Sequence, residues 1–225
     1  TLGFTKLTPR IVQVMGGDEA AFGDPGSLFA PQEEISLDDL ADAKVLTADF
    51  YKDKTVAVHV IFDGKTPFRT VTNTYLSNGD TIVKTDDTKA VLAVLQGAKV
   101  IVTTQTKEII EAFGADVPAE ISLFNADKTA RIHDMSLIAY LLDPTRTNYG
   151  YLYLTERFSV PSIANGSVDV ECVSMVKALL AMNEVACESA RREELWSLYE
   201  TIELPLIHTL VVMEKNGQMR TRFRA

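Results

Sequence analysis

Three β-strand patterns followed by an alternation of helix and strand are the feature that most restricts the possible folds of this chain. The three runs, rich in Val, Ile and Thr, lie at 55–62, 68–74 and 81–84. Asp63-Gly64 and Asn78-Gly79 separate them, and such dipeptides are typical of tight hairpin turns. A helical pattern at 88–96 and a buried-type strand at 100–104 come next, and this order builds parallel strands. The sequence therefore predicts an α/β fold with a mixed sheet.

The residues before residue 55 have weaker patterns. Residues 1–35 mix apolar positions with glycine and proline, so we expect a connector segment there. A helix is predicted to begin at Ser36, with acidic residues in its first turn. Val45-Leu46-Thr47 has the period of a strand and is predicted to be the first strand of the sheet.

The second half of the chain is predicted to be mainly helical. The patterns cover 135–142, 151–158, about 168–190 and 192–215. The last two predict an antiparallel helical hairpin with a polar turn at 188–192. Asp134 precedes the first of these helices and is predicted to cap it. Trp196 is expected to pack inside the hairpin.

Composition indicates one main globular domain with an acidic surface. Hydrophobic residues make up 46% of the 225 residues, and the formal net charge is −9. A polyanion such as DNA would be repelled, and Arg220, Arg222 and Arg224 are interpreted as a solvated terminus. No run is long enough to span a membrane and no secretion signal is visible, so a cytoplasmic location is expected. Cys172 and Cys187 lie too far apart on one predicted helix for a disulfide.

Three segments, in this order and spacing, carry a resemblance to one family. They are Leu2-Gly-Phe-Thr-Lys-Leu7, Ile132-His-Asp-Met-Ser-Leu-Ile-Ala-Tyr-Leu-Leu-Asp-Pro144, and Ile202-Glu-Leu-Pro-Leu-Ile207 with Val212-Met-Glu-Lys-Asn-Gly217. Together they resemble the 3′–5′ exonuclease domain of bacterial family A DNA polymerases such as DNA polymerase I.

The resemblance implies a ribonuclease H-like fold, with a mixed sheet whose first three strands are antiparallel, flanking helices and the C-terminal helical hairpin. It also implies an exonuclease-like domain at 36–190 and a helix at 191–225 that leads toward a polymerase domain. The chain would then be a monomeric fragment of a polymerase of the bacterial nucleoid, active in DNA replication and repair. DNA would be bound through the polymerase domain.

Proofreading nucleases of this kind hold two Mg²⁺ or Mn²⁺ ions with four carboxylates. The family's first motif, Asp-x-Glu on the first strand, falls on Thr47 and Asp49. The second places an asparagine near Thr104 and an aspartate four residues later. Counting from the strand puts Glu108 at that aspartate, whereas counting back from Gly114 puts Thr106 there.

The third motif pairs a tyrosine with an aspartate four residues later, and these positions carry Gly166 and Val170, with Asp169 adjacent. No catalytic residue, metal or other cofactor is therefore expected, and the domain is predicted to be catalytically inactive with a structural role. The alternative is an active exonuclease with a rearranged cluster of Asp49, Glu108 and Asp169 that binds Mg²⁺ or Mn²⁺. A third hypothesis is a binding protein that holds a nucleotide or a single strand of nucleic acid in the cleft where the family has its nuclease site. The three histidines show no metal-ligand spacing.

Overall fold

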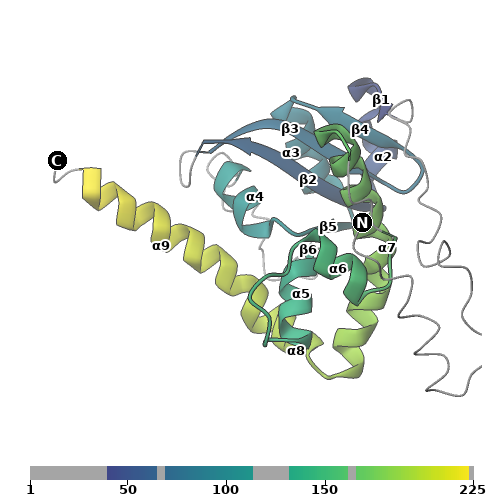
Figure 1. The fold of residues 1–225 in the computed structure, drawn as a ribbon. Coiled ribbons are helices and arrows are strands. Elements are labelled where there is room, and N and C mark those ends of the chain that lie inside the picture. The colour runs from purple at the N-terminus through teal and green to yellow at the C-terminus, as the bar shows by residue number, and fades with distance from the viewer. Residues whose placement is uncertain (1–39, 65–68, 114–131, 162–165, 223–225) are drawn as a thin grey trace, which may run out of the picture. The chain divides into compact units, whose positions relative to one another are not determined.

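A six-stranded mixed sheet is the centre of the fold (Figure 1). The computed structural model describes residues 40–64, 69–113, 132–161 and 166–222, the last eight of them by their backbone alone. The strands are β1 (Leu40–Ala41), β2 (Thr55–Asp63), β3 (Thr70–Ser77), β4 (Ile82–Thr85), β5 (Val100–Thr103) and β6 (Ile132–Asp134). Their order is β1-β4-β3-β2-β5-β6.

The antiparallel meander and the parallel strands that follow it are confirmed. β3 is antiparallel to both β2 and β4, whereas β2–β5, β5–β6 and β1–β4 are parallel pairs. Gly64 and Gly79 have φ of 87° and 96°, a backbone region that glycine enters without steric cost. The two glycine dipeptides therefore mark the two hairpins as predicted.

The predicted strand at Val45–Thr47 is wrong. Ala43–Val45 forms a 3₁₀ turn (η5) whose start is capped by the Asp42 side chain, and α2 (Ala48–Tyr51) follows directly. Val45 is 41% exposed, so burial in a sheet does not oppose the local helical hydrogen bonds. The edge strand is instead Leu40–Ala41, within the segment predicted to be a helix from Ser36. Consequently β2 is the first long strand of the sheet.

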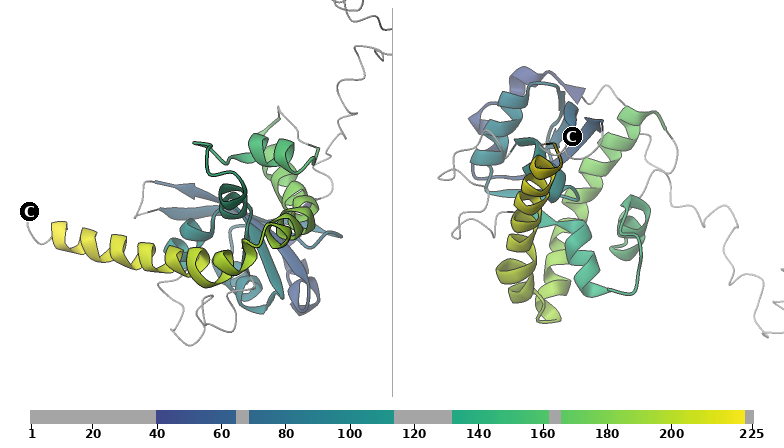
Figure 2. Two further views of the ribbon diagram at one scale, coloured as in Figure 1. Left: turned by 90° about the horizontal axis from the view of Figure 1, so that it is seen from below. Right: turned by 90° about the vertical axis from the view of Figure 1, so that its left-hand side faces the viewer.

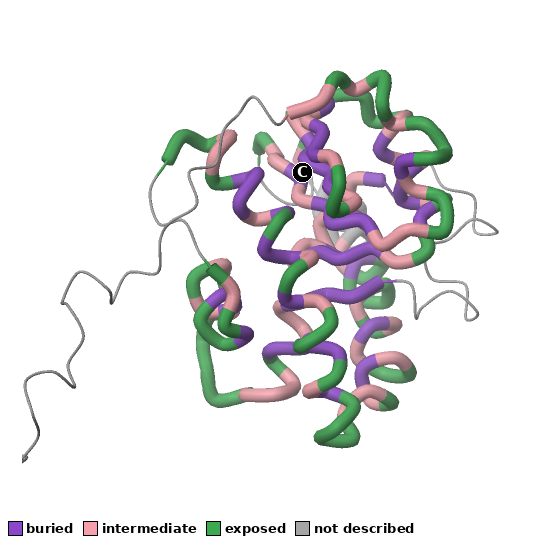
Figure 3. The backbone as a smooth tube through the Cα atoms, turned by 90° about the vertical axis from the view of Figure 1, so that its right-hand side faces the viewer, coloured by how far each residue is buried: buried purple, intermediate pink, exposed green. Residues whose placement is uncertain are grey.

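Helices cover both faces of the sheet (Figure 2). They are α3 (Thr88–Gly97), α4 (Thr106–Phe113), α5 (Met135–Leu142), α6 (Tyr151–Arg157) and α7 (Val168–Arg192). Ile101 and Ile132 of the sheet meet Leu95 of α3 and Ile110 of α4 on one face. α7 packs on β2, β3 and β5 from the other face, and α5 and α6 pack on α7. The buried residues concentrate in the strands and along the inner side of the helices (Figure 3).

The helix α7 spans 25 residues and begins where the Ser167 side chain accepts a hydrogen bond from Val170 N. Cys172 and Cys187 both lie on it, buried and free of any disulfide, as their spacing predicted. Asp134 caps α5 by accepting a hydrogen bond from Leu137 N, which confirms that prediction as well.

The C-terminal helices are present, but the segment predicted at 192–215 is not one continuous α-helix. It consists of α8 (Trp196–Leu198), the π-helical turn η8 (Tyr199–Glu203) and α9 (Leu204–Arg222). Pro205 lacks the N–H that would bond to the fourth residue before it, and the π turn directly precedes it. The polar turn lies at Glu193–Leu195, where Glu194 has a φ of 60°. From there α9 diverges from α7 and packs on α4 (Figure 1).

Trp196 is half-buried and packs against the core. Its ring meets the edge of His133 at 5.4 Å between centroids. The expected connector at 1–35 lies outside the described residues, and the domain division at residue 190 stays a prediction. No described helix is both long and apolar enough to cross a membrane.

Candidate functional site

The face of β2 that meets α7 is where the first nuclease motif would have to lie. Tyr75 on β3 stands opposite His59 on β2, and the Tyr75 hydroxyl donates a hydrogen bond to Asp169 of α7. His59 therefore points to α7, as do Ala57 and Ile61, because side chains alternate along a strand. None of these three positions carries a carboxylate.

The first-motif positions predicted from the sequence lie outside the sheet. Thr47 is the N-cap of α2 and Asp49 lies in its first turn, and both are exposed. α2 packs against α3, on the opposite side of the sheet from α7. The strand at Val45–Thr47 on which the placement of the motif on Thr47 and Asp49 depends does not form.

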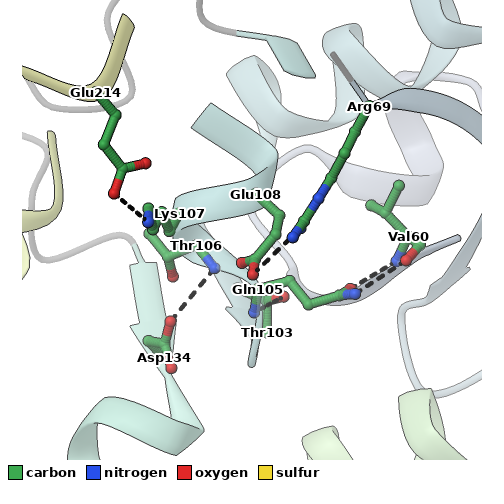
Figure 4. A network of polar contacts seen from close by, with 9 residues as sticks. All are labelled: Val60, Arg69, Thr103, Gln105, Thr106, Lys107, Glu108, Asp134 and Glu214. Carbon is green, nitrogen blue, oxygen red and sulfur yellow. Dashed lines mark hydrogen bonds and ion pairs between the residues drawn. The ribbon is translucent and has the colours of Figure 1, made fainter. Parts of the chain in front are cut away.

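The segment after β5 is occupied by structural contacts (Figure 4). The Gln105 side chain donates to Val60 O at 2.9 Å and accepts from Val60 N at 2.8 Å, so it extends the pairing of β2 beyond the end of β5. Thr106 is buried, and its N–H donates to Asp134 Oδ2 at 3.3 Å. Glu108 lies 3.6 Å from Arg69 Nη1. Of the two candidates for the aspartate position of the second motif, Thr106 offers no carboxylate and Glu108 is in an ion pair with Arg69.

The N-terminus of α7 holds one carboxylate against the sheet. Gly166 and Val170 offer no functional side chain at the third-motif positions. Asp169, between them, accepts from Lys84 Nζ at 2.8 and 3.0 Å and from the Tyr75 hydroxyl. The hydrogen bond from Lys84, and then that from Tyr75, lowers the pKa of Asp169 below its ordinary value. Asp169 is thus an ionised partner of a lysine.

A row of polar side chains crosses three strands at this place: His59 on β2, Tyr75 on β3 and Lys84 on β4. Burial lowers the pKa of His59 to about 4, and its Nδ1 atom is shielded from solvent with no hydrogen-bond partner. Burial also raises the pKa of the nearby Cys172 thiol to about 11. At neutral pH the row therefore presents a neutral imidazole, a phenol and an ammonium group. None of the three was predicted as a site residue, because strand register alone brings them together.

The three acidic residues of the alternative hypothesis are held apart. Asp49 belongs to α2, which packs against α3. Glu108 of α4 pairs with Arg69, and Asp169 of α7 pairs with Lys84. Among the residues that the structure describes, no three His, Cys, Asp or Glu side chains gather closely enough to hold a metal ion.

A hollow of about 340 Å³ is lined by residues near β5, α5, α6 and α7. Its lining includes Thr104 after β5, Ser136 of α5, Tyr149, Tyr151 of α6 and Met175 of α7. All of these side chains are uncharged at neutral pH. Thr104, the expected asparagine position of the second motif, thus faces a neutral cavity.

The strand order, the parallel and antiparallel pairs and the two helical layers define a ribonuclease H-like fold of the 3′–5′ exonuclease type. No protein-family model matches the sequence, and no curated protein matches it either. Solved structures do match. NrnC of Brucella melitensis bound to pGG has a TM-score of 0.56 at 16% identity, covering 74% of this chain and 89% of that chain.

Two larger proteins contain a similar domain. One is Escherichia coli RNase D, described as an exoribonuclease involved in structured RNA processing. It has a TM-score of 0.54 at 13% identity, and the match covers 75% of this chain and 47% of the RNase D chain. The POL domain structure of Pol1 from M. smegmatis, with DNA primer-template and dNTP, has a TM-score of 0.60 at 17% identity. It covers 76% of this chain, which spans 30% of the Pol1 chain. At these identities the likeness defines the fold.

Proposed function

We propose that this chain is an exonuclease-fold domain that has lost metal-dependent hydrolysis and has a structural role in a family A DNA polymerase. The observation that carries the proposal is the contact of Asp169 with Lys84. This carboxylate is the one nearest to the third motif, and a lysine ammonium group neutralises it. On the facing strand, the positions directed at α7 carry Ala57, His59 and Ile61.

The chemistry of phosphodiester hydrolysis explains why these contacts matter. One metal activates the attacking water and another stabilises the leaving oxygen, and clustered carboxylates must offset the charge of both ions. Here the excess negative charge is gone, because Lys84 balances Asp169 and His59 is neutral. A divalent cation at this place would be repelled by the ammonium group of Lys84 rather than attracted by a net negative charge.

The polymerase context rests on the sequence resemblance and on the fold shared with the Pol1 chain. α9 would be the helix that leads from this domain toward the polymerase domain, and DNA would contact that domain. A net charge of −9 fits a domain that does not bind DNA by itself. A monomeric fragment in the bacterial cytoplasm is part of the same proposal.

An active 3′–5′ exonuclease is the second candidate function. It is supported by the fold, since NrnC has also been solved with bound Mg²⁺. In this case Asp49, Glu108 and Asp169 would have to leave their present partners and converge on Mg²⁺ or Mn²⁺. One set of assays separates the two candidates.

The first assay is a titration of the protein with Mn²⁺ by isothermal calorimetry. The second is digestion of 5′-labelled single-stranded DNA and of the dinucleotide pGG in Mg²⁺ or Mn²⁺. We expect no saturable heat and no product above a blank preparation. The matched variants are Asp169→Asn and Asp49→Ala. Metal-dependent cleavage that disappears in either variant would establish the exonuclease instead.

A further inference from the structure

The contact between α4 and α9 contains two carboxyl groups and one ammonium group. Lys107 Nζ of α4 donates to Glu214 Oε1 of α9 at 2.8 Å (Figure 4). Glu111 lies one helical turn beyond Lys107 on the same side of α4, and the carboxyl groups of Glu111 and Glu214 are close enough to shift each other's pKa. Glu111 Oε1 and Glu214 Oε2 are both shielded from solvent and have no hydrogen-bond partner.

Two facing carboxylates cannot satisfy each other, because each is only an acceptor when ionised. Lys107 supplies a single positive charge to the pair. In the part of the chain that the structure describes, the other charged groups that act on Glu111 are Glu108 and Arg69, which pair with each other. Protonating one carboxyl group creates the missing donor and removes the repulsion.

The two carboxyl groups titrate in opposite directions. Burial raises the pKa of Glu111, Glu214 raises it further, and Lys107 opposes both effects. The hydrogen bond from Lys107 lowers the pKa of Glu214. Near the ordinary pKa of a glutamate, about 4.3, Glu111 therefore stays protonated while Glu214 is ionised and paired with Lys107.

The base of α9 has the geometry of a hinge. The π turn η8 precedes it, and Leu204 N bonds to Tyr199 O five residues back. Pro205 then leaves one helical hydrogen bond unmade. Tyr199 anchors the turn, because its hydroxyl bonds to two backbone groups of β6. Beyond this anchor Leu206, Leu210 and Met213 are exposed whereas Val211 is buried, so the part of α9 whose side chains are described contacts the domain along one side.

We propose that Lys107, Glu111 and Glu214 form a pH-sensitive latch that holds α9 against α4, and that α9 turns about the π turn when the latch opens. The latch is closed near the ordinary pKa of a glutamate and opens as the pH rises and Glu111 ionises. It also opens in strong acid, when Glu214 is protonated. The consequence for a neighbouring domain rests on the proposed function, in which α9 leads toward the polymerase domain.

The test is a spin-label distance measured by pulsed electron resonance in the full chain. Labels are attached to cysteines introduced at Met213 on α9 and Leu152 on α6, which are 62% and 63% exposed. The native cysteines are buried, and the unsubstituted protein checks that they stay unlabelled. We expect a narrow distance distribution at about pH 4.5, close to the ordinary pKa of a glutamate, and a broader, shifted one at about pH 8.

The variant Glu111→Gln carries an amide donor at every pH, so its distribution should be narrow at both values. Glu108→Gln is the matched control, since Glu108 lies on the same helix but pairs with Arg69, and it should keep the pH response. Identical distributions at both values in the parent protein, or a response that persists in Glu111→Gln, would overturn the latch. Samples contain neither metal nor nucleic acid, so this outcome is independent of whether the domain hydrolyses DNA.

Discussion

At the scale of single residues, Tyr199 shows how one hydroxyl group can secure a C-terminal element to the sheet. It is completely buried, and its hydroxyl donates to Ile132 O and accepts from Asp134 N, both at 2.8 Å. β6 is the last strand in the sheet order, so these two backbone groups lie on its open edge. The hydroxyl therefore provides hydrogen-bond partners for two backbone groups of β6 that would otherwise be buried without any.

Replacing this tyrosine tests the contact directly. In Tyr199→Phe the ring remains, but a buried N–H and a buried C=O lose their partner. We expect the free energy of unfolding to fall by about 2 to 4 kcal/mol, measured by urea denaturation. Tyr153→Phe is the control, because the Tyr153 hydroxyl makes one 3.3 Å contact with the partly exposed Asp143. Its cost should stay below about 1 kcal/mol, and equal losses in the two variants would contradict the assigned role.

At the scale of elements, the junction of α2 and α3 depends on a missing side chain. α3 ends at Gly97, where a Cβ atom would lie 2.2 Å from Cε2 of Tyr51 in α2. The bridge between Lys52 and Ala98 joins the chain at the same place. Glycine at the end of α3 therefore allows the ring of Tyr51 to pack against the helix.

A double-mutant cycle checks this packing. Gly97→Ala alone should lower the free energy of unfolding by about 1 to 3 kcal/mol, because the ring must move. In a Tyr51→Ala background the same substitution should instead stabilise by about 0.5 to 1 kcal/mol, since alanine is the better helix former. Additive effects in the cycle would show that Tyr51 is not the cause.

At the scale of the whole molecule, metal binding would couple to stability. A ligand that binds only the folded state at about 100 times its Kd adds about 2.7 kcal/mol. The proposed function predicts no such gain, because the described acidic residues considered for the site are paired with Lys84 or Arg69 or lie on α2.

Thermal unfolding measures this outcome independently of any nuclease assay. We expect the same unfolding midpoint with Mn²⁺ as with NaCl of equal ionic strength and with EDTA. A rise specific to Mn²⁺ that is lost in Asp169→Asn would place a metal at the N-terminus of α7 and would contradict the proposed loss of the site.

The sequence by itself determined the elements that depend on local chemistry. These elements are the turns at Gly64 and Gly79, the cap at Asp134 and the helical periodicity of α7. Each depends on interactions among a few neighbouring residues. Their order, together with the family resemblance, was enough to predict the ribonuclease H-like mixed sheet. The prediction of a strand at Val45–Thr47 was wrong, because three residues with the period of a strand do not form one without a neighbouring strand to pair with.

Only the tertiary structure decided which side chains meet at the site. His59, Tyr75 and Lys84 form a row because of the register of β2, β3 and β4, and Asp169 reaches that row from a helix 85 residues after Lys84. The interruption of the C-terminal helix at η8 and the contact of α9 with α4 were likewise decided by the tertiary structure. Such contacts depend on the pairing and packing of distant segments, and no local periodicity encodes which of them lie side by side.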